Sequence, residues 1–396
     1  MPTLRFVLQG SLLCLQAAFA WPPDWPDPAQ VPDDPVAAVE RSDEYAWRLF
    51  IALNWPRNHV GHADPGRASW ESWANAADVY RRDGADPGPW HAAGDVPIAT
   101  QHRFESPAAA DLPNVRHVVA GRMVPLRGSL ARAARLVEIR MNRVAFDYIR
   151  AEELYNLDGQ IRHVAAGVPV KFPAGAIELK ASWRPIDAAE QERYHTLRVR
   201  FADGSTRLFG LDALNIAAKE QPEWFWASFE HVDNASRPGA EGWKLPSRDV
   251  FACGDAPPDC NRFPAGLDPD RGAWRNYRLR GTMTRYIDAA GNPQRLGNSE
   301  LEAGFQQTAS CMTCHARAAL ALIDGMPERL PVFDVRRGED VRARRGFVGV
   351  PDAAWYQRRA TDGNAGTDFM SLDFVWSLAQ ARLKAARPTD TNGAHR

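Results

Sequence analysis

The chain has 396 residues, with 48 Lys and Arg against 49 Asp and Glu, and therefore a formal net charge of −1. This balance argues against a nucleic-acid or anionic-membrane partner, because both attract basic surfaces. Apolar residues make up 45% of the chain and include 14 Trp, so a substantial core is available. The length allows one large domain or two smaller ones.

The first 20 residues resemble a secretory signal peptide. Arg5 supplies the positive charge, an apolar run follows to Phe19, and Ala18 and Ala20 form an A-x-A cleavage site. The run is too short for a spanning helix, which needs about 20 apolar residues, and no later segment is longer. We therefore expect residues 1–20 to be removed and the mature protein to lie in the periplasm without a membrane span.

The mature chain opens with a proline-rich arm. Residues 21–35 contain six prolines and predict an extended segment that its tryptophans pin to the core. Asp33 or Asp34 should then cap a helix through "VAAVERSDEYAWRLFIALNW", and Ser69 a shorter helix through "WESWANAADVY". Residues 81–113 are rich in Gly, Pro and Asp and predict surface loops.

From about residue 135 the apolar pattern has a period of two. The stretches are "RLVEIRM", "AIELKASWR", "HTLRVRF", "TRLFGLDAL", "WFWASFEHV" and "NYRLRGTMTRYI". In the second of them, Ile177 and Leu179 alternate with Glu178 and Lys180. Such alternation predicts strands buried on one face, which favours an antiparallel sheet. A helix over "RVAFDYIRAEELYNL" is expected to interrupt the series.

Beyond the strands the pattern returns to helix. Ser299 and Glu302 have the spacing of a capping box that would open a helix over "ELEAGFQQTAS". Further helices are expected over "CHARAALALI" and "LDFVWSLAQARLKAA". We thus predict an α+β protein with a mainly antiparallel β-rich domain over 36–295, a mostly helical haem-binding segment over 296–387 and a disordered tail over 388–396.

The sequence "CMTCH" carries the clearest chemical signal. Cys311 and Cys314 lie one helical turn apart, and His315 follows at once. This is the attachment motif of c-type haem, in which both thiols bind the porphyrin edge and the histidine is the proximal iron ligand. The rival interpretations are a zinc site and a dithiol redox site. The redox site is disfavoured because it needs a buried strand before the first cysteine, and a polar segment precedes Cys311.

A second cysteine pair lies in "CGDAPPDC". In an oxidising compartment Cys253 and Cys260 predict a local disulfide. The alternatives are two free thiols, or a zinc site formed with the cysteines of the haem motif, which would fit a cytosolic chain better.

The sixth iron ligand is the least determined feature. We expect Met370 to be the distal ligand, because it immediately precedes the last expected helix and is far enough from His315 for the chain to wrap the haem. A buried core methionine and an open iron site are the alternatives. The other candidate side chains are Met326, His395 and, only if the β-rich part folds over the iron, His231 and Met283.

Two further features are open to a functional interpretation. Residues 336–345, "RRGEDVRARR", are net basic and could steer an acidic redox partner, but a solvated loop is the simpler interpretation of them. His231 follows an aromatic strand, and a hydrogen-bonded structural histidine is the simpler interpretation of it.

Several stretches of the chain resemble one family. "LFIALNWP", "IELKASWRP", "WFWASFEHVDN", "LGNSELEAGFQQTASCMTCHARA" and "LDFVWSL" are similar to exported bacterial proteins described as uncharacterised or cytochrome c family proteins. The resemblance spans about residues 40–385 and implies that the β-rich part and the haem segment form one inherited unit. It implies haem binding by Cys311, Cys314 and His315 but no substrate. Ala316 departs from the small cytochromes c, many of which have Gly there.

These observations predict a periplasmic monohaem c-type cytochrome that transfers electrons. It would need haem-maturation machinery and a redox partner protein. The alternative is a haem enzyme of peroxidase or oxygenase type, or a gas-binding module, with an open iron site. Size favours this alternative, because a carrier needs only about 100 residues and most of this chain precedes the motif.

Overall fold

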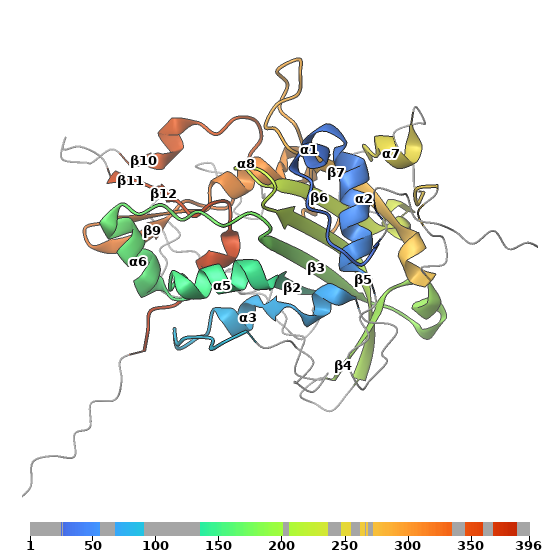
Figure 1. The fold of residues 1–396 in the computed structure, drawn as a ribbon, viewed down its shortest axis with the longest axis horizontal. Helices are drawn as coiled ribbons and strands as arrows, with labels where there is room; N and C mark the ends of the chain where they lie inside the picture. Colours follow the sequence, from blue (N-terminus) through green and yellow to red (C-terminus); the bar gives the residue numbers. More distant parts are fainter. Residues whose placement is uncertain are drawn as a thin grey trace, which may run out of the picture.

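The computed structural model describes residues 25, 27–55, 68–90, 135–200, 206–236, 247–254, 262–265, 267, 272–334, 345–358 and 367–385. The expected signal peptide, most of the loops over 81–113 and the tail over 388–396 lie outside them. Within this part of the chain, a central antiparallel sheet separates two apolar clusters, one on each face (Figure 1).

The sheet has seven strands in the order β1-β2-β3-β5-β6-β7, with β4 paired to β5. The strands are β1 (Ala74–Asn75), β2 (Leu136–Met141), β3 (Ile177–Pro185), β4 (Thr196–Arg200), β5 (Thr206–Ala218), β6 (Phe225–His231) and β7 (Tyr277–Met283). Every pairing is antiparallel. All six stretches with a period of two therefore form the expected strands, and the antiparallel prediction is confirmed.

The first face of the sheet is covered by α1 (Pro35–Glu40) and α2 (Ser42–Leu53), which cross it in Figure 1. Asp34 caps α1, because its carboxylate accepts a 2.9 Å hydrogen bond from the backbone N–H of Ala37. The backbone breaks at Arg41, so two helices stand where one was expected. Trp25 is 5% exposed in this cluster, which confirms that a tryptophan pins the arm.

The second face is covered by helices from the middle of the chain and by the C-terminal segment. The helices are α3 (Ala76–Val79), α5 (Arg143–Ala151) and α6 (Leu157–Ala166), so the expected helix after β2 is confirmed but ends at Ala151. Phe172 and Leu378 share one apolar cluster on this face, although they lie on opposite sides of the expected boundary at 295/296.

The C-terminal segment does not form the mostly helical unit that we expected. Its described residues contain the short helix α8 (Cys311–Ala316) and a three-stranded antiparallel sheet of β12 (Met370–Ser371), β8 (Ala319–Ile323) and β9 (Met326–Arg329). The alanine-rich stretch after the motif pairs as β8, so tertiary pairing overrides its helix propensity.

The expected last helix is also wrong, and only a 3₁₀ turn, η9 (Trp376–Gln380), forms there. Besides the hydrogen bonds of the 3₁₀ turn itself, backbone groups in and after η9 bond distant parts of the chain. The carbonyl of Leu378 accepts a 2.9 Å bond from the side chain of Gln160, and that of Arg382 accepts a 2.9 Å bond from the N–H of Leu157. Positive φ angles at Asp373 and Phe374, 51° and 70°, also interrupt any helix.

Two other helix predictions are wrong. The carboxylate of Glu302 accepts from the backbone N–H of Asn298, not of Ser299, and only turns and a 3₁₀ segment, η7 (Gln306–Thr308), follow. "WESWANAADVY" divides into η1 (Ser69–Ser72), β1 and α3, because the stretch joins the sheet edge through β1.

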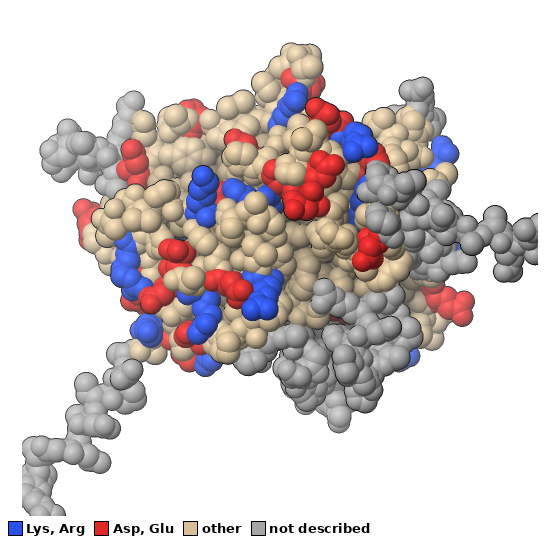
Figure 2. Space-filling view, viewed as in Figure 1, with Lys and Arg blue, Asp and Glu red and all other residues tan. Residues whose placement is uncertain are grey.

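The remaining elements lie around this framework. They are η4 (Ala188–Arg193), η5 (Val232–Ser236), α7 (Val250–Cys253), η6 (Gly272–Asn276), η8 (Ala353–Tyr356), β10 (Gln357–Arg358) and β11 (Thr367–Asp368). Acidic and basic side chains are interspersed on the face in Figure 2, as the near-zero net charge leads one to expect. No helix within the described residues is long and apolar enough to cross a bilayer.

Candidate haem site

The motif residues lie on α8, whose start is fixed by a buried hydroxyl pair. Ser310 is the N-cap, with its Oγ accepting a 3.3 Å hydrogen bond from the backbone N–H of Thr313. The two hydroxyls are 2.9 Å apart, and Thr313 donates to the carbonyl of Gly349 at 2.7 Å. Ser310 also lies 3.3 Å from the sulfur of Met283 on β7. These contacts fix the turn that carries both cysteines against the sheet.

Both motif cysteines are unpaired and half-buried. The thiol of Cys311 donates to the carbonyl of Leu296 at 3.4 Å, and Cys314 Sγ accepts a 3.2 Å bond from the N–H of Phe347. Burial, and after it for Cys311 the nearby carboxylate of Glu302, raises the pKa of both thiols. A dithiol redox centre needs a lowered thiol pKa, so this environment disfavours the redox interpretation.

The imidazole of His315 is held by one hydrogen bond and one ring contact. Nδ1 lies 2.7 Å from the carbonyl oxygen of Phe374, which can only accept, so Nδ1 carries the proton. The ring of Trp226 on β6 lies 4.4 Å away between centroids. Burial lowers the pKa of His315 to about 4, which keeps the ring neutral at physiological pH. Nε2 therefore presents a lone pair, and it has no hydrogen-bond partner in the described part of the chain.

A row of polar residues on the sheet lies beside the motif. Lys180 pairs with Asn215 across β3 and β5, on the same face as Trp226. Asn215 donates to the carboxylate of Glu302 at 3.2 Å. The charge of Lys180 is close enough to oppose the burial that raises the pKa of Glu302 and to add to the burial that lowers the pKa of His315. Lys180 and Asn215 are half-buried although they lie on central strands, so the second face is incompletely covered here.

These residues fit a covalent haem. The two free thiols occupy positions i and i+3 of a helix, the spacing that places side chains on one face. His315 has its Nδ1 proton bound to a backbone carbonyl, the arrangement that fixes the tautomer of a metal-ligating histidine. Cys311 and Cys314 would form the thioethers and His315 Nε2 would bind the iron.

The other proposed ligands are placed less favourably. His231 is fully buried at the end of β6, where Nε2 donates to the carbonyl of Arg193 at 3.0 Å and Nδ1 accepts from the N–H of Asp233 at 3.2 Å. Both of its nitrogens are thus in use. Met370 is half-buried on β12 and packs against the second apolar cluster, which also fits a core methionine. The sheet does fold over the motif, but it brings Met283, not His231, to α8.

Some sequence expectations fall outside the described residues. Cys253, at the end of α7, is disulfide-bonded, but Cys260 is not described, so their pairing stays a prediction. A bonded Cys253 cannot supply a thiolate to a four-cysteine zinc site. The basic stretch 336–345 is described only at Arg345, and His395 not at all. The described residues contain no group of three or more His, Cys, Asp or Glu that could hold a metal ion.

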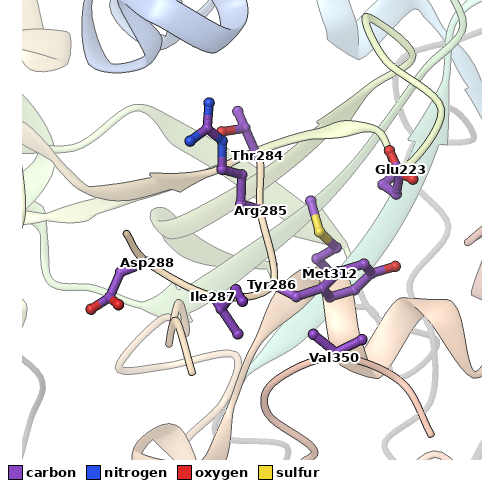
Figure 3. Close-up of a pocket in the computed structure, with 8 residues that line it drawn as sticks. All are labelled: Glu223, Thr284, Arg285, Tyr286, Ile287, Asp288, Met312 and Val350. Carbon is purple, nitrogen blue, oxygen red and sulfur yellow. The ribbon is translucent and has the colours of Figure 1, made fainter. Parts of the chain in front are cut away.

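A separate pocket of about 420 Å³ lies beside α8 (Figure 3). Met312, between the two cysteines, lines it together with Tyr286 and Val350, and these three side chains lie together in the close-up. Arg285 and Asp288 point away from Met312 there. The thiols do not line this pocket, so it is distinct from the surface on which the haem would bind.

Comparisons of the chain with protein-family models, with curated proteins and with solved structures give no match. The site therefore has to be interpreted from its own geometry. Sequence reasoning identified the motif but missed Trp226, Lys180 and Phe374, which the fold brings to it. Strand alternation put Lys180 on the face opposite Leu179, but no local signal paired that face with Trp226 or with α8. Nothing in the sequence marked the carbonyl of Phe374.

Proposed function

We propose that this protein is a periplasmic monohaem c-type cytochrome that transfers electrons to or from a partner protein. Cys311 and Cys314 attach the haem and His315 is the proximal ligand. The bound haem supplies a one-electron redox couple, and the chain binds it, orients it and limits its access to water. Export belongs to the proposal, because thioether attachment in bacteria occurs outside the cytoplasm.

The observation that carries the proposal is the state of His315 beside two unpaired thiols. Its Nδ1 proton is bound to a backbone carbonyl at 2.7 Å, and its low pKa of about 4, caused mainly by burial, keeps the ring neutral. A neutral imidazole with a free Nε2 is the form that binds iron. A histidine with a purely structural role would have both nitrogens satisfied, as His231 has.

The test is expression in a host with haem-maturation machinery, followed by acid–acetone extraction. The wild-type protein should stay red, because thioether-linked haem is not extracted. Cys311→Ala with Cys314→Ala should give a colourless protein, whereas Cys253→Ala, outside the motif, should retain the colour. A colourless wild-type protein that binds zinc would overturn the proposal.

We propose Met370 as the sixth ligand, since it lies on the strand that pairs with β8 directly after the motif. A Met–iron bond gives a weak near-red absorption band in the oxidised protein. Met370→Ala should remove that band, while Met326→Ala, at an exposed position on β9, should keep it. An unchanged spectrum in Met370→Ala would leave Met370 as core packing and direct the search to Met283.

The second candidate function, a haem enzyme or gas-binding module with an open iron site, is favoured by the polar row of Lys180, Asn215 and Glu302. The ammonium of Lys180 has no hydrogen-bond or ion-pair partner among the described residues. The amide oxygen of Asn215 is buried without a partner. Buried polar groups are normally satisfied, so these groups are the ones expected to bind a polar ligand at an open iron.

Ligand binding separates the two functions. An open site should bind carbon monoxide rapidly when reduced and turn over peroxide, whereas a closed one should do neither. At an open site Lys180→Gln should weaken azide binding about tenfold, the size of one charge-assisted hydrogen bond. Lys171→Gln, which removes an exposed lysine, should leave azide binding unchanged. Equal azide affinities in all three proteins would exclude Lys180 from the site.

A further inference from the structure

The carbonyl of Phe374, which accepts the hydrogen bond from His315, lies in a strained turn. Asp373 and Phe374 have φ angles of 51° and 70°, in the left-handed region that side chains other than glycine rarely occupy. A bulky aromatic residue persists there only where the surrounding structure enforces it. In this turn the enforced conformation has a direct result, because it presents the oxygen of Phe374 to Nδ1 at 2.7 Å.

The contacts that enforce the turn converge on Asp373. Its Oδ1 lies 2.7 Å from Nζ of Lys219, and its Oδ2 accepts a 2.7 Å hydrogen bond from the backbone N–H of Phe172. Its own N–H donates to Ser371 at 3.1 Å. The ion pair is nearly buried, with side-chain exposures of 8% for Lys219 and 10% for Asp373. Asp373 is therefore tied to the residue after β5 through Lys219 and to the segment before β3 through Phe172.

Lys219 is itself rigidly placed. It follows β5, its Nζ donates to the carbonyl of Pro222 at 2.8 Å, and it lies 5.4 Å from the centre of the Trp224 ring. Two carbonyl or carboxylate acceptors and an aromatic face thus surround one ammonium group. An ammonium held this tightly fixes the distance to its carboxylate partner, and the bond from the N–H of Phe172 to the second oxygen fixes the direction of the carboxylate.

We propose that Lys219 and Asp373 are positioning residues for His315. Their ion pair holds Phe374 in its left-handed conformation, so the carbonyl fixes the tautomer and the ring orientation of the imidazole. Neither residue touches the motif. They act on His315 through the backbone of one turn. The expected effect on the iron rests on the proposed haem function.

The test follows the Nδ1 proton of His315 by NMR in the haem-loaded protein. In the wild type this proton should exchange slowly with water. Lys219→Met and Asp373→Asn should each raise the exchange rate at least about fivefold, the effect of losing one hydrogen bond. They should also raise the reduction potential, because an imidazole without its acceptor donates less electron density to the metal. Lys219→Arg should restore both values.

Two controls separate positioning from general stability. The buried ion pair of Glu138 and Arg140, 2.9 Å long, lies on the other face of the sheet. Glu138→Gln breaks this pair and should destabilise the fold without changing the exchange rate of the Nδ1 proton. The double variant Lys219→Met with Asp373→Asn removes both charges. It should regain stability relative to the single variants and still show fast exchange.

The inference is overturned if haem-loaded Lys219→Met and the double variant keep the wild-type exchange rate and potential. A failure of the haem function looks different, since no variant would then hold haem. In that event ¹⁵N NMR of the haem-free full chain still decides the inference. The wild-type His315 ring should be a single Nδ1–H tautomer and Lys219→Met a mixture, and a single tautomer in both would contradict it.

Discussion

Two histidines, one on β6 and one on α8, lie on opposite faces of the central sheet and differ in how their ring nitrogens are bonded. His231 and Trp226 both belong to β6 but point to different faces, and Trp226 contacts His315. His231 is stacked on Tyr194 at 3.6 Å and uses both ring nitrogens. His315 is held through Nδ1, but its Nε2 has no hydrogen-bond partner among the residues that the structure describes. The same sheet thus supports a closed histidine on one face and an open one on the other.

The two faces differ in the same way as their histidines. The first is sealed by aromatic side chains, such as Phe50 stacked on Phe229 at 4.3 Å, and by buried pairs such as Arg140–Glu138. The second contains half-buried thiols, a strained turn and a lysine that has no ion-pair partner among the described residues. Strained backbone and unsatisfied polar groups are uncommon in protein interiors, so we expect the second face to be the functional one.

The largest effect is expected from His315→Ala. Without the proximal imidazole, the haem iron loses a protein ligand. The absorption bands of histidine-ligated haem, whether five- or six-coordinate, should therefore disappear from the spectrum. Imidazole added to the solution should restore it in part by entering the space left by the side chain. A variant with the wild-type spectrum would show that His315 is not an iron ligand.

His231→Ala should lower the stability of the fold and leave the haem spectrum unchanged. It empties a buried site and leaves the groups of Arg193 and Asp233 without their partner, so the free energy of unfolding should fall by about 3 kcal/mol. Denaturant unfolding measures this loss. The haem spectrum at low denaturant should be unchanged, and a changed spectrum would place His231, against its hydrogen bonds, at the iron.

The pH dependence of stability should report on the first face. Burial raises the pKa of Asp249, which accepts from the indole of Trp47, from 3.8 to about 6. Between pH 4 and pH 6 the unfolded chain releases this proton while the folded chain keeps it. The contribution of Asp249 to the free energy of unfolding should therefore fall as the pH rises through this window, by at most about 3 kcal/mol. His315, with its pKa lowered to about 4, contributes a rise over the same window, so the contribution of Asp249 is measured as the difference between the wild type and Asp249→Asn.

Asp249→Asn removes the titrating group and should flatten this pH dependence, while Asp83→Asn, at an exposed site, should not. The redox behaviour of the haem should be the same in both variants. A pH dependence that is the same in Asp249→Asn as in the wild type would assign the fall to another carboxyl group.

The smallest effect is expected at the end of α8. The hydroxyl of Tyr356 donates to the carbonyl of Ala316 at 2.9 Å, one of the acceptors that a helix leaves open at its C-terminus. Tyr356→Phe should lower the free energy of unfolding by about 1 kcal/mol. Haem attachment should be complete, and incomplete attachment would mean that the end of α8 controls access to the thiols.

The sequence predicted the strands correctly, because their alternating pattern has a single physical cause. Strand alternation in residues such as Ile177 and Leu179 follows from burial on one face, so the sheet strands were predictable. The structure after the motif was not predictable in this way. Helices were expected there, but backbone groups in this segment bond partners far away in the chain, as the carbonyl of Leu378 does with Gln160. The motif itself was visible, but the carbonyl of Phe374 was hidden, since its position depends on a distant ion pair.

The most direct test of the central claim is the mass of the protein after expression with haem-maturation machinery. Intact-protein and peptide mass spectrometry should find one added haem on the peptide that contains Cys311 and Cys314. The peptide that contains Cys253 should carry none. Unmodified thiols at Cys311 and Cys314 in a protein secreted by a host that matures other c-type cytochromes would contradict the account.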